Sequence, residues 1–164
     1  ETSIAKKIIQ EIKLLNSFSN KPFRLQYVPD DLKTKTLCLI AINLDGLELI
    51  HIPDELKTPD ICMAAVKQNG AALQYIPHYL RTASMYFEAI KNEGTALSVL
   101  PAAFHTEAIY IVATRQNGLA LKYVPYHLRS ESVCTAALDE CRSAFKYVPY
   151  KLLDRMEKYL NAKH

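Results

Sequence analysis

The chain has 164 residues, of which 49% are hydrophobic, so it has the length and apolar content of one folded domain and is not a disordered tail. Its formal net charge of +3 is a weaker positive charge than a nucleic-acid-binding domain normally carries. The longest apolar stretches, such as 37–42, are far shorter than the roughly 20 residues that cross a bilayer, so the sequence predicts no membrane span.

The first predicted element is an amphipathic helix over residues 3–16. Ile4, Ile8, Ile12 and Leu15 recur at helical spacing and share one face, while lysine, glutamate and glutamine residues occupy the others. An array of repeats must end without exposing an apolar face. We therefore expect this helix to cap the first repeat.

From residue 22 the chain is a 24-residue repeat. Proline and glycine each recur at this period. The prolines are Pro29, Pro53, Pro77, Pro101, Pro125 and Pro149, and the glycines are Gly46, Gly70, Gly94 and Gly118. A fixed period of this length is typical of stacked supersecondary units. The predicted fold class is all-α, an α-solenoid of about six helical repeats in a single domain over 1–164. Five full repeats span 22–141, and a degenerate capping repeat spans 142–164.

The second half of each repeat predicts a helix with marked ends. In the repeat that begins at Gly46, Thr58 is the expected N-cap and Pro59 occupies the first helical position. Gly70 follows the last turn, where a left-handed residue would close the helix. On that interpretation a change of Gly70 to alanine costs about 1 kcal/mol.

Apolar residues on these helices form one stripe. Ile61, Cys62, Ala65 and Val66 follow an i, i+1, i+4, i+5 pattern that predicts the buried face. A small residue recurs at one register, at Ala41, Ala65, Ala89, Ala113 and Ala137. We expect neighbouring repeats to touch there, because small side chains allow close helix packing.

The first half of each repeat predicts a short helical turn, a break before the proline and a second turn. Val124, for example, precedes Pro125, and a residue before proline avoids the helical region. Leucine-rich repeats have a similar period, and 47–56 superficially resembles one. Asn69 and Asn117 instead follow alanine-rich helical runs, so the helical interpretation explains more residues.

Four cysteines could form two disulfides. Cys38, Cys62 and Cys134 occupy the same apolar register, however, and a cysteine on an apolar helix face is usually a small core residue. We expect buried, reduced thiols and a cytoplasmic, reducing location.

Two segments resemble a known family. They are residues 65–77, AVKQNGAALQYIP, and residues 115–125, RQNGLALKYVP. Residues 22 to 155 resemble the bacterial helical repeat family catalogued as domain of unknown function 4116. The resemblance implies a recognition role, because similar repeats occur in large proteins of bacteria that live in or on eukaryotic cells, including effectors delivered into a host cell. The repeat at Gly94 departs most, with Val99 in place of tyrosine and Phe104-His105 in place of leucine and a cation.

No local pattern indicates catalysis. The five histidines lie at no metal-ligand spacing, and the glycines are too far apart to form a phosphate loop. The acid pairs after Pro29 and Pro53 suit the first turn of a short helix. We expect no catalytic residue, no metal, no cofactor and no enzymatic activity, although a serine, histidine and acid could still be brought together by folding.

The two residues after each proline change character from acidic to aromatic and basic along the chain. We take six of them as candidate partner-binding residues, because exposed aromatics give large, stiff contact area: His78, Tyr79, Tyr126, His127, Tyr150 and Lys151. Ordinary surface variation is the alternative.

A candidate basic ladder precedes the capping Thr or Ser of each helix, at Lys33, Lys57, Arg81 and Arg129. It could follow an acidic partner, but we favour a role in complementing the negative ends of helix dipoles.

These patterns predict a monomeric, non-catalytic scaffold for protein–protein interaction. Two alternatives stay open. The chain could bind nucleic acid through its cations and tyrosines, which the weak net charge disfavours, or it could be an accessory recognition segment of a larger enzyme.

Overall fold

A computed structural model describes residues 6, 9 and 24–163 of the chain. The predicted capping helix over 3–16 therefore lies outside the described residues, apart from Lys6 and Ile9, which are helical.

Six α-helices, each of 10 residues, lie within residues 24–163. They are α2 (Lys35–Leu44), α3 (Pro59–Gln68), α4 (Ala83–Asn92), α5 (Glu107–Gln116), α6 (Glu131–Glu140) and α7 (Leu153–Ala162). The first residues of the first five helices are spaced by the repeat period. No strand occurs within residues 24–163. The prediction of an all-α helical repeat fold is confirmed.

Between the α-helices run pairs of 3-10 helices. The longer member of each pair spans Gly46–His51, Gly70–Tyr75, Gly94–Val99, Gly118–Tyr123 or Arg142–Tyr147. At the start of the described chain, Leu25–Tyr27 occupies the register of the longer member. The shorter member follows each proline and spans Asp30–Leu32, Asp54–Leu56, His78–Leu80, Ala102–Phe104, Tyr126–Leu128 or Tyr150–Leu152. The predicted break is confirmed, because the pre-proline residue is extended, with φ −71° and ψ 128° at Val124.

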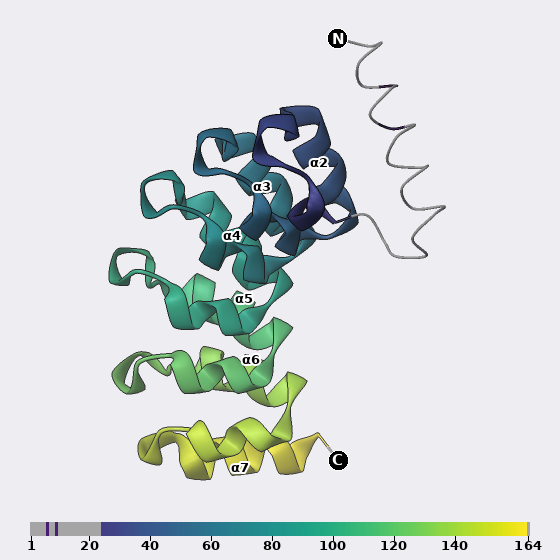
Figure 1. Ribbon diagram of the computed structural model, residues 1–164. Coiled ribbons are helices and arrows are strands. Elements are labelled where there is room, and N and C mark those ends of the chain that lie inside the picture. Colours follow the sequence, from purple (N-terminus) through teal and green to yellow (C-terminus); the bar gives the residue numbers. More distant parts are fainter. Residues whose placement is uncertain (1–5, 7–8, 10–23, 164) are drawn as a thin grey trace. The chain divides into compact units, whose positions relative to one another are not determined.

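The chain divides into two compact units, Glu1–Arg81 and Thr82–His164. In the first unit α2 packs on α3, and in the second unit α4, α5, α6 and α7 pack in chain order, as Figure 1 shows. The single domain over 1–164 and the solenoid form stay predictions.

The predicted apolar stripe forms the core of both units. In α3 Ile61, Cys62, Ala65 and Val66 are fully buried. The same register in α4 is filled by four residues that are also buried, Met85, Tyr86, Ala89 and Ile90. In the part of the chain that the structure describes, no helix is both long enough and apolar enough to cross a membrane.

Most α-helices begin at the predicted hydroxyl cap. The side chains of Thr34, Thr82, Thr106 and Ser130 each accept a hydrogen bond from the amide three residues on. Thr58 is the N-cap residue of α3, as predicted, but its hydroxyl accepts no capping bond and is buried without a partner among the described residues. The predicted capping bond of Thr58 is therefore wrong.

The recurring glycine has a different role from the predicted one. The residue that follows α3 is Asn69, with φ −149° and ψ 113°, so the helix ends in extended backbone and not in a left-handed residue. A Cβ atom built on Gly118 would lie 2.4 Å from the carbonyl oxygen of Ala137 in α6. Similar clashes, at 2.6 and 2.3 Å, would arise between Gly46 and Ala65 and between Gly94 and Ala113. The glycine is required because the next helix approaches the backbone closely.

These contacts also account for the alanine register. Ala65, Ala113 and Ala137 are fully buried, and their carbonyls lie against the glycine of the preceding repeat. The prediction that neighbouring repeats touch at this register is confirmed. A glutamine adds a polar contact at the same junction: Gly46 N–H donates to Gln68 Oε1, and Gly94 N–H to Gln116 Oε1, both at 2.5 Å.

The last helix contributes a buried methionine and is bonded to α6 by several polar contacts. Met156 is buried, while Arg155 donates to Glu131 of α6. Asp139, also in α6, accepts from Tyr159 Oη and from Lys163 Nζ, each at 2.5 Å. Both bonds lower the pKa of the Asp139 carboxyl group, with Lys163 contributing most.

Substitution of Gly118 by alanine should destabilise the second unit by about 2 kcal/mol, as expected for overpacking against backbone that cannot move aside. This cost is larger than that of losing a left-handed cap, which was the basis of the Gly70 prediction. Urea unfolding followed by circular dichroism would measure it. The control is Ser143→Ala, an exposed change in the equivalent 3-10 helix of the next repeat. Equal midpoints for the two variants would contradict the close-approach explanation.

Candidate functional site

The lysines of the basic ladder bind the protein itself. Lys33 Nζ donates to the carbonyl of His51 in the next repeat at 2.7 Å and pairs with Asp30 at 2.6 Å. Lys57 pairs with Asp54 at 2.8 Å. The side chains of these two lysines are only 7% and 10% exposed, so they offer little charge to a partner. Asp30 and Asp54 belong to the acid pairs that we expected to be structural.

The arginines of the ladder bind main-chain carbonyls. Arg81 Nε donates to the carbonyl of Ile76 at 2.8 Å. Arg129 makes the corresponding bond to Val124 at 2.9 Å, and its two other guanidinium nitrogens donate to Lys122 at 3.2 Å and to Tyr147 in the next repeat at 2.6 Å. These carbonyls lie at or next to the ends of 3-10 helices. This placement is the one that the helix-dipole interpretation expects.

His105 occupies the ladder register in the divergent repeat. Its Nε2 lies 3.0 Å from the carbonyl oxygen of Leu100, five residues back, as Arg129 Nε lies from Val124. Because a carbonyl only accepts, Nε2 carries the proton. Nδ1 lies 2.7 Å from the hydroxyl of Tyr110, a residue that is 1% exposed and whose pKa is raised by burial. Histidine in place of the usual arginine or lysine therefore keeps the hydrogen bond to the main-chain carbonyl five residues back, with a smaller side chain.

The candidate partner-binding residues are exposed. His78 and Tyr79 lie in the first unit, with Tyr79 79% exposed. The other four lie in the second unit, at two consecutive post-proline turns: Tyr126, His127, Tyr150 and Lys151. Tyr126 and Tyr150 are 56% and 84% exposed. The structure therefore brings four of the six together in one unit and describes the remaining two separately.

The two exposed tyrosines of the second unit are linked. The hydroxyl oxygen of Tyr126 accepts a hydrogen bond from the main-chain N–H of Tyr150 at 2.9 Å. Arg129 stacks over the Tyr126 ring, with 5.7 Å between the guanidinium carbon and the ring centroid. Tyr126 is thus held on both its edge and its face, although much of its side chain faces solvent.

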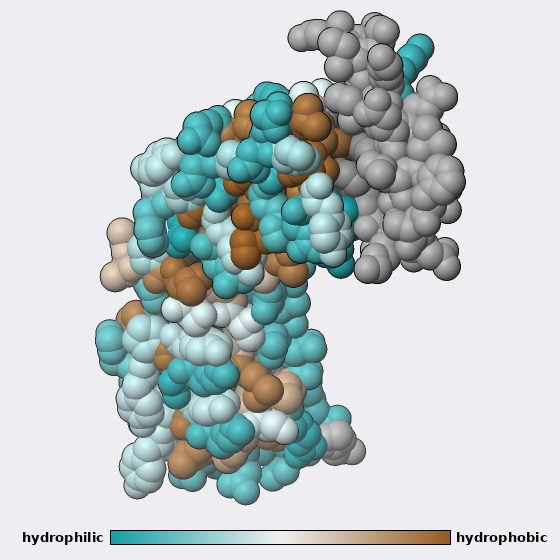
Figure 2. Space-filling model, in the orientation of Figure 1, coloured by the Kyte–Doolittle hydropathy of each residue, from teal (hydrophilic) through white to brown (hydrophobic). Residues whose placement is uncertain are grey.

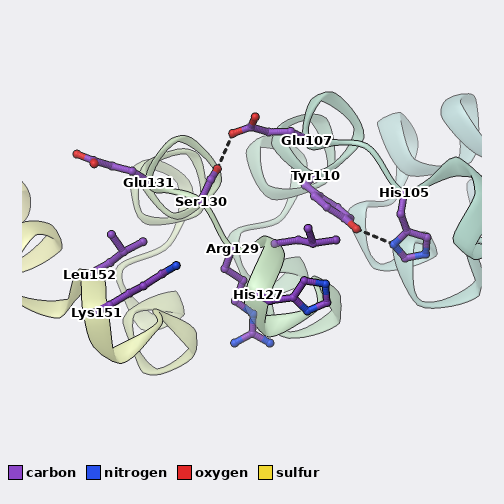
Figure 3. A pocket seen from close by; sticks show the side chains of 10 residues that line it. His105, Glu107, Tyr110, His127, Arg129, Ser130, Glu131, Lys151 and Leu152 are labelled. Atoms are coloured by element: carbon purple, nitrogen blue, oxygen red, sulfur yellow. Dashed lines mark hydrogen bonds between the residues drawn. The ribbon is translucent and has the colours of Figure 1, made fainter.

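Beside these turns lies a cleft of about 340 Å³ within the second unit. It is lined from three consecutive repeats by His105, Glu107, Tyr110, His127, Leu128, Arg129, Ser130, Glu131, Lys151 and Leu152. Figure 3 shows the Lys151 side chain extending past Leu152 toward Arg129, with His127 on the far side of Arg129. The cleft therefore contains two of the predicted partner-binding residues and one residue of the ladder.

The carboxylates of the cleft are bonded to neighbouring side chains. Ser130 Oγ donates to Glu107 Oε1 at 2.5 Å, a contact drawn in Figure 3. Arg155 donates to Glu131 Oε2 at 2.5 Å. Ser130 also caps α6, so its hydroxyl is committed to structure on both sides. No histidine bonds to Ser130 within the described residues, so the open possibility of a serine triad gains no support here.

Sequence reasoning missed most of the cleft lining. Glu107, Ser130, Glu131 and Tyr110 were not singled out, because each reads locally as a helix cap, a first-turn acid or a core aromatic. A usable signal was present: Glu107 and Glu131 share one register, and His127 and Lys151 share another. Only folding shows that these two registers face the same cleft.

Other chemistry-bearing groups do not form a site among the described residues. No group of three or more histidine, cysteine, aspartate or glutamate side chains is placed to hold a metal ion there. All four cysteines are free, with Cys38, Cys62 and Cys134 buried. Burial raises the pKa of all three thiols, and that of Cys134 to about 11.

Together the fold and the cleft define a helical-repeat protein with an exposed edge of aromatic and basic side chains. A comparison with protein families agrees at the level of sequence. The family model described as domain of unknown function (DUF4116) matches residues 34–81 and 58–104. The predicted resemblance to this family is confirmed over residues 34–104. Neither a curated protein nor a solved structure matches the chain.

Truncation of Arg129 to alanine should lower the free energy of unfolding by about 2–3 kcal/mol, because three carbonyls lose a charged donor that is partly shielded from solvent. Arg129→Lys should recover part of the loss, since lysine fills this register at Lys33. Thermal and urea unfolding would measure both variants against Lys158→Ala on exposed α7 surface. A loss no greater than in that control would show that the three hydrogen bonds of Arg129 do not contribute to stability.

Thiol reactivity should separate Cys141 from the other cysteines. A thiol reacts as its thiolate, so a raised pKa and burial both slow the reaction of Cys38, Cys62 and Cys134. At pH 8 we expect a disulfide reagent to titrate one thiol of the native protein quickly, and the other three only after unfolding. Replacement of Cys141 by serine should remove the fast phase, whereas Cys134→Ser should leave it unchanged.

Proposed function

We propose that the chain is a non-catalytic, monomeric binding module that recognises another protein through its second unit. The binding surface is the post-proline edge, the two exposed turns that carry Tyr126, His127, Tyr150 and Lys151. The observation that carries this proposal is the linked pair Tyr126 and Tyr150, which expose 56% and 84% of their surface beside a cleft. Tyrosine is enriched among the residues that dominate binding energy at protein interfaces.

Preorganisation supports this edge as a binding surface. A side chain that is already held loses less entropy when a partner binds. The bond between the Tyr126 hydroxyl and the Tyr150 amide holds one ring and one turn in place before binding. Figure 2 shows a visible face of the second unit that is mostly hydrophilic, with small separate hydrophobic patches. Such a surface favours a few aromatic anchors in a polar contact over a broad apolar interface.

The family resemblance and the cysteines support the setting of this module. We place it in a reducing, cytoplasmic compartment, because three buried thiols with raised pKa values are suited to remain reduced. We further propose that the module is delivered into a host cell, which the similar repeats in effector-type bacterial proteins support.

Nucleic-acid binding receives less support. Lys33, Lys57 and Arg129 donate to carbonyls or pair with aspartates of the protein, so binding phosphates would require them to leave those partners. Two carboxylates also line the cleft beside the exposed tyrosines. We therefore propose a protein partner.

Removal of the two anchors should abolish partner binding without unfolding the chain. The test is affinity capture from a eukaryotic cell lysate, quantified by mass spectrometry, with wild type and with Tyr126→Ala plus Tyr150→Ala. Proteins that depend on the edge should fall by at least about tenfold, as expected for loss of two aromatic anchors worth 1 kcal/mol or more each.

The matched control is Phe87→Ala, which removes an aromatic ring of 42% exposure from α4, a helix that contains neither post-proline turn. It should leave the captured proteins unchanged. Equal capture by wild type, the double variant and the control would remove the tyrosines as anchors and with them the proposal.

A further inference from the structure

The cleft of the second unit has two facing ladders that follow the repeat. His127 and Lys151 occupy the second place after their prolines in consecutive repeats, and Glu107 and Glu131 occupy the first position of consecutive α-helices. In the first unit the second post-proline place is acidic at Asp31 and Glu55. Basic groups at this register are thus a feature of the last two repeats.

The two ladders differ in how their charges are used. Glu107 and Glu131 are each bonded to a neighbouring side chain, Ser130 or Arg155. Arg129 donates to three carbonyls. Lys151 and His127 are exposed and have no hydrogen-bond or ion-pair partner among the described residues. The polar groups that the cleft leaves free are therefore donors, and one of them is a lysine ammonium group.

The surroundings of Lys151 favour an anionic ligand. Leu128 and Leu152 line the same cleft, so a charge bound there would have apolar surface beside it. An ion pair strengthens as the local dielectric constant falls. His127 donates a hydrogen bond whether its ring is neutral or charged, so it can accompany Lys151 near neutral pH.

We propose that this cleft binds an extended acidic segment of the partner protein, with one carboxylate on Lys151 and a second on His127. The inference rests on the proposed function and names the chemistry of the segment that is recognised. Packed repeats step by about 8–10 Å, and an extended chain advances about 3.3 Å per residue. The two acidic residues of the segment therefore lie two or three positions apart, and the flanking residues contact Tyr126 and Tyr150.

The same cleft disfavours a run of phosphates. Glu107 and Glu131 form the facing ladder, and a closely spaced polyanion would place several charges near them. A peptide can direct its carboxylates to one side and its main-chain N–H groups to the other, where they can donate to these two carboxylates. Charge complementarity on both sides favours an acidic peptide over nucleic acid.

The test uses fluorescence anisotropy with a labelled peptide of about ten residues in which glutamate alternates with serine, titrated with the full chain. The expected result is binding at least about tenfold tighter than that of the same peptide with glutamine in place of glutamate. Lys151→Glu should remove this preference, and His127→Ala should weaken binding by a few fold.

The matched control is Lys158→Glu, which makes the same charge change at an exposed lysine on α7, outside the cleft. It should change binding by less than about twofold, because Lys158 does not line the cleft and its charge is exposed to the screening solvent. Lys151→Glu should in turn bind a peptide in which lysine alternates with serine. Equal losses in the two glutamate variants, or equal binding of the glutamate and glutamine peptides, would overturn the proposal.

Two further outcomes separate this inference from the proposed function. If an oligothymidine competes for the cleft better than the glutamate peptide, the ligand is nucleic acid and the inference is wrong. If Tyr126→Ala plus Tyr150→Ala loses captured proteins while Lys151→Glu retains them all, the acidic-segment inference fails and the binding module stands. The reverse pattern would remove the tyrosine anchors and leave the cleft.

Discussion

The close approach of one repeat's glycine to the next repeat's alanine carbonyl is the contact on which the packing of each unit depends. A Cβ atom at Gly46, Gly94 or Gly118 would lie within 2.6 Å of that oxygen, so only glycine allows the observed spacing. The alanine at the other side of the junction is small for the same reason, because a larger side chain would separate the helices. Once the backbones lie this close, the apolar stripe of each helix is covered by its neighbour, and the core forms as a series of small contacts and not as one central cluster.

This arrangement leaves many carbonyls at the ends of short 3-10 helices, and cationic side chains satisfy them. Lys33 and Arg129 reach a carbonyl of the following repeat, while Arg81, Arg129 and His105 bind the carbonyl five residues back. Buried or half-buried carbonyls need a donor, and a charged donor gives a stronger bond than a neutral one. The consequence for function is that most of the regularly spaced positive charge stabilises the fold. The exposed side chains at the post-proline turns, such as Tyr126 and Tyr150, are the groups to which we assign the proposed binding.

The sequence predicted the local structure well because local structure depends on residues that are close together in the chain. Helix bounds follow from a hydroxyl cap such as Thr34 or Ser130 and from the apolar spacing at Ile61 to Val66, and the break at Val124 follows from the proline after it. The errors concern contacts between repeats. Gly70 was expected to close α3 in a left-handed conformation, whereas α3 ends in extended backbone at Asn69. Nothing within one repeat shows the close approach of the next helix that is found at Gly46, Gly94 and Gly118. Thr58 was expected to accept a capping bond, whereas its hydroxyl is buried.

By itself, the sequence determined the period, the helical class, the residues of the core and the exposed tyrosines, because each of these depends on residues within about one turn or one repeat of each other. Only the tertiary structure decided which side chains meet across repeats. The bonds of Ser130 to Glu107, of Tyr150 to Tyr126 and of Arg155 to Glu131 join residues 23 or 24 positions apart, and the cleft exists only where three repeats bring those pairs together. Such contacts depend on the distance and rotation between neighbouring repeats, which side-chain packing sets and which no local pattern encodes.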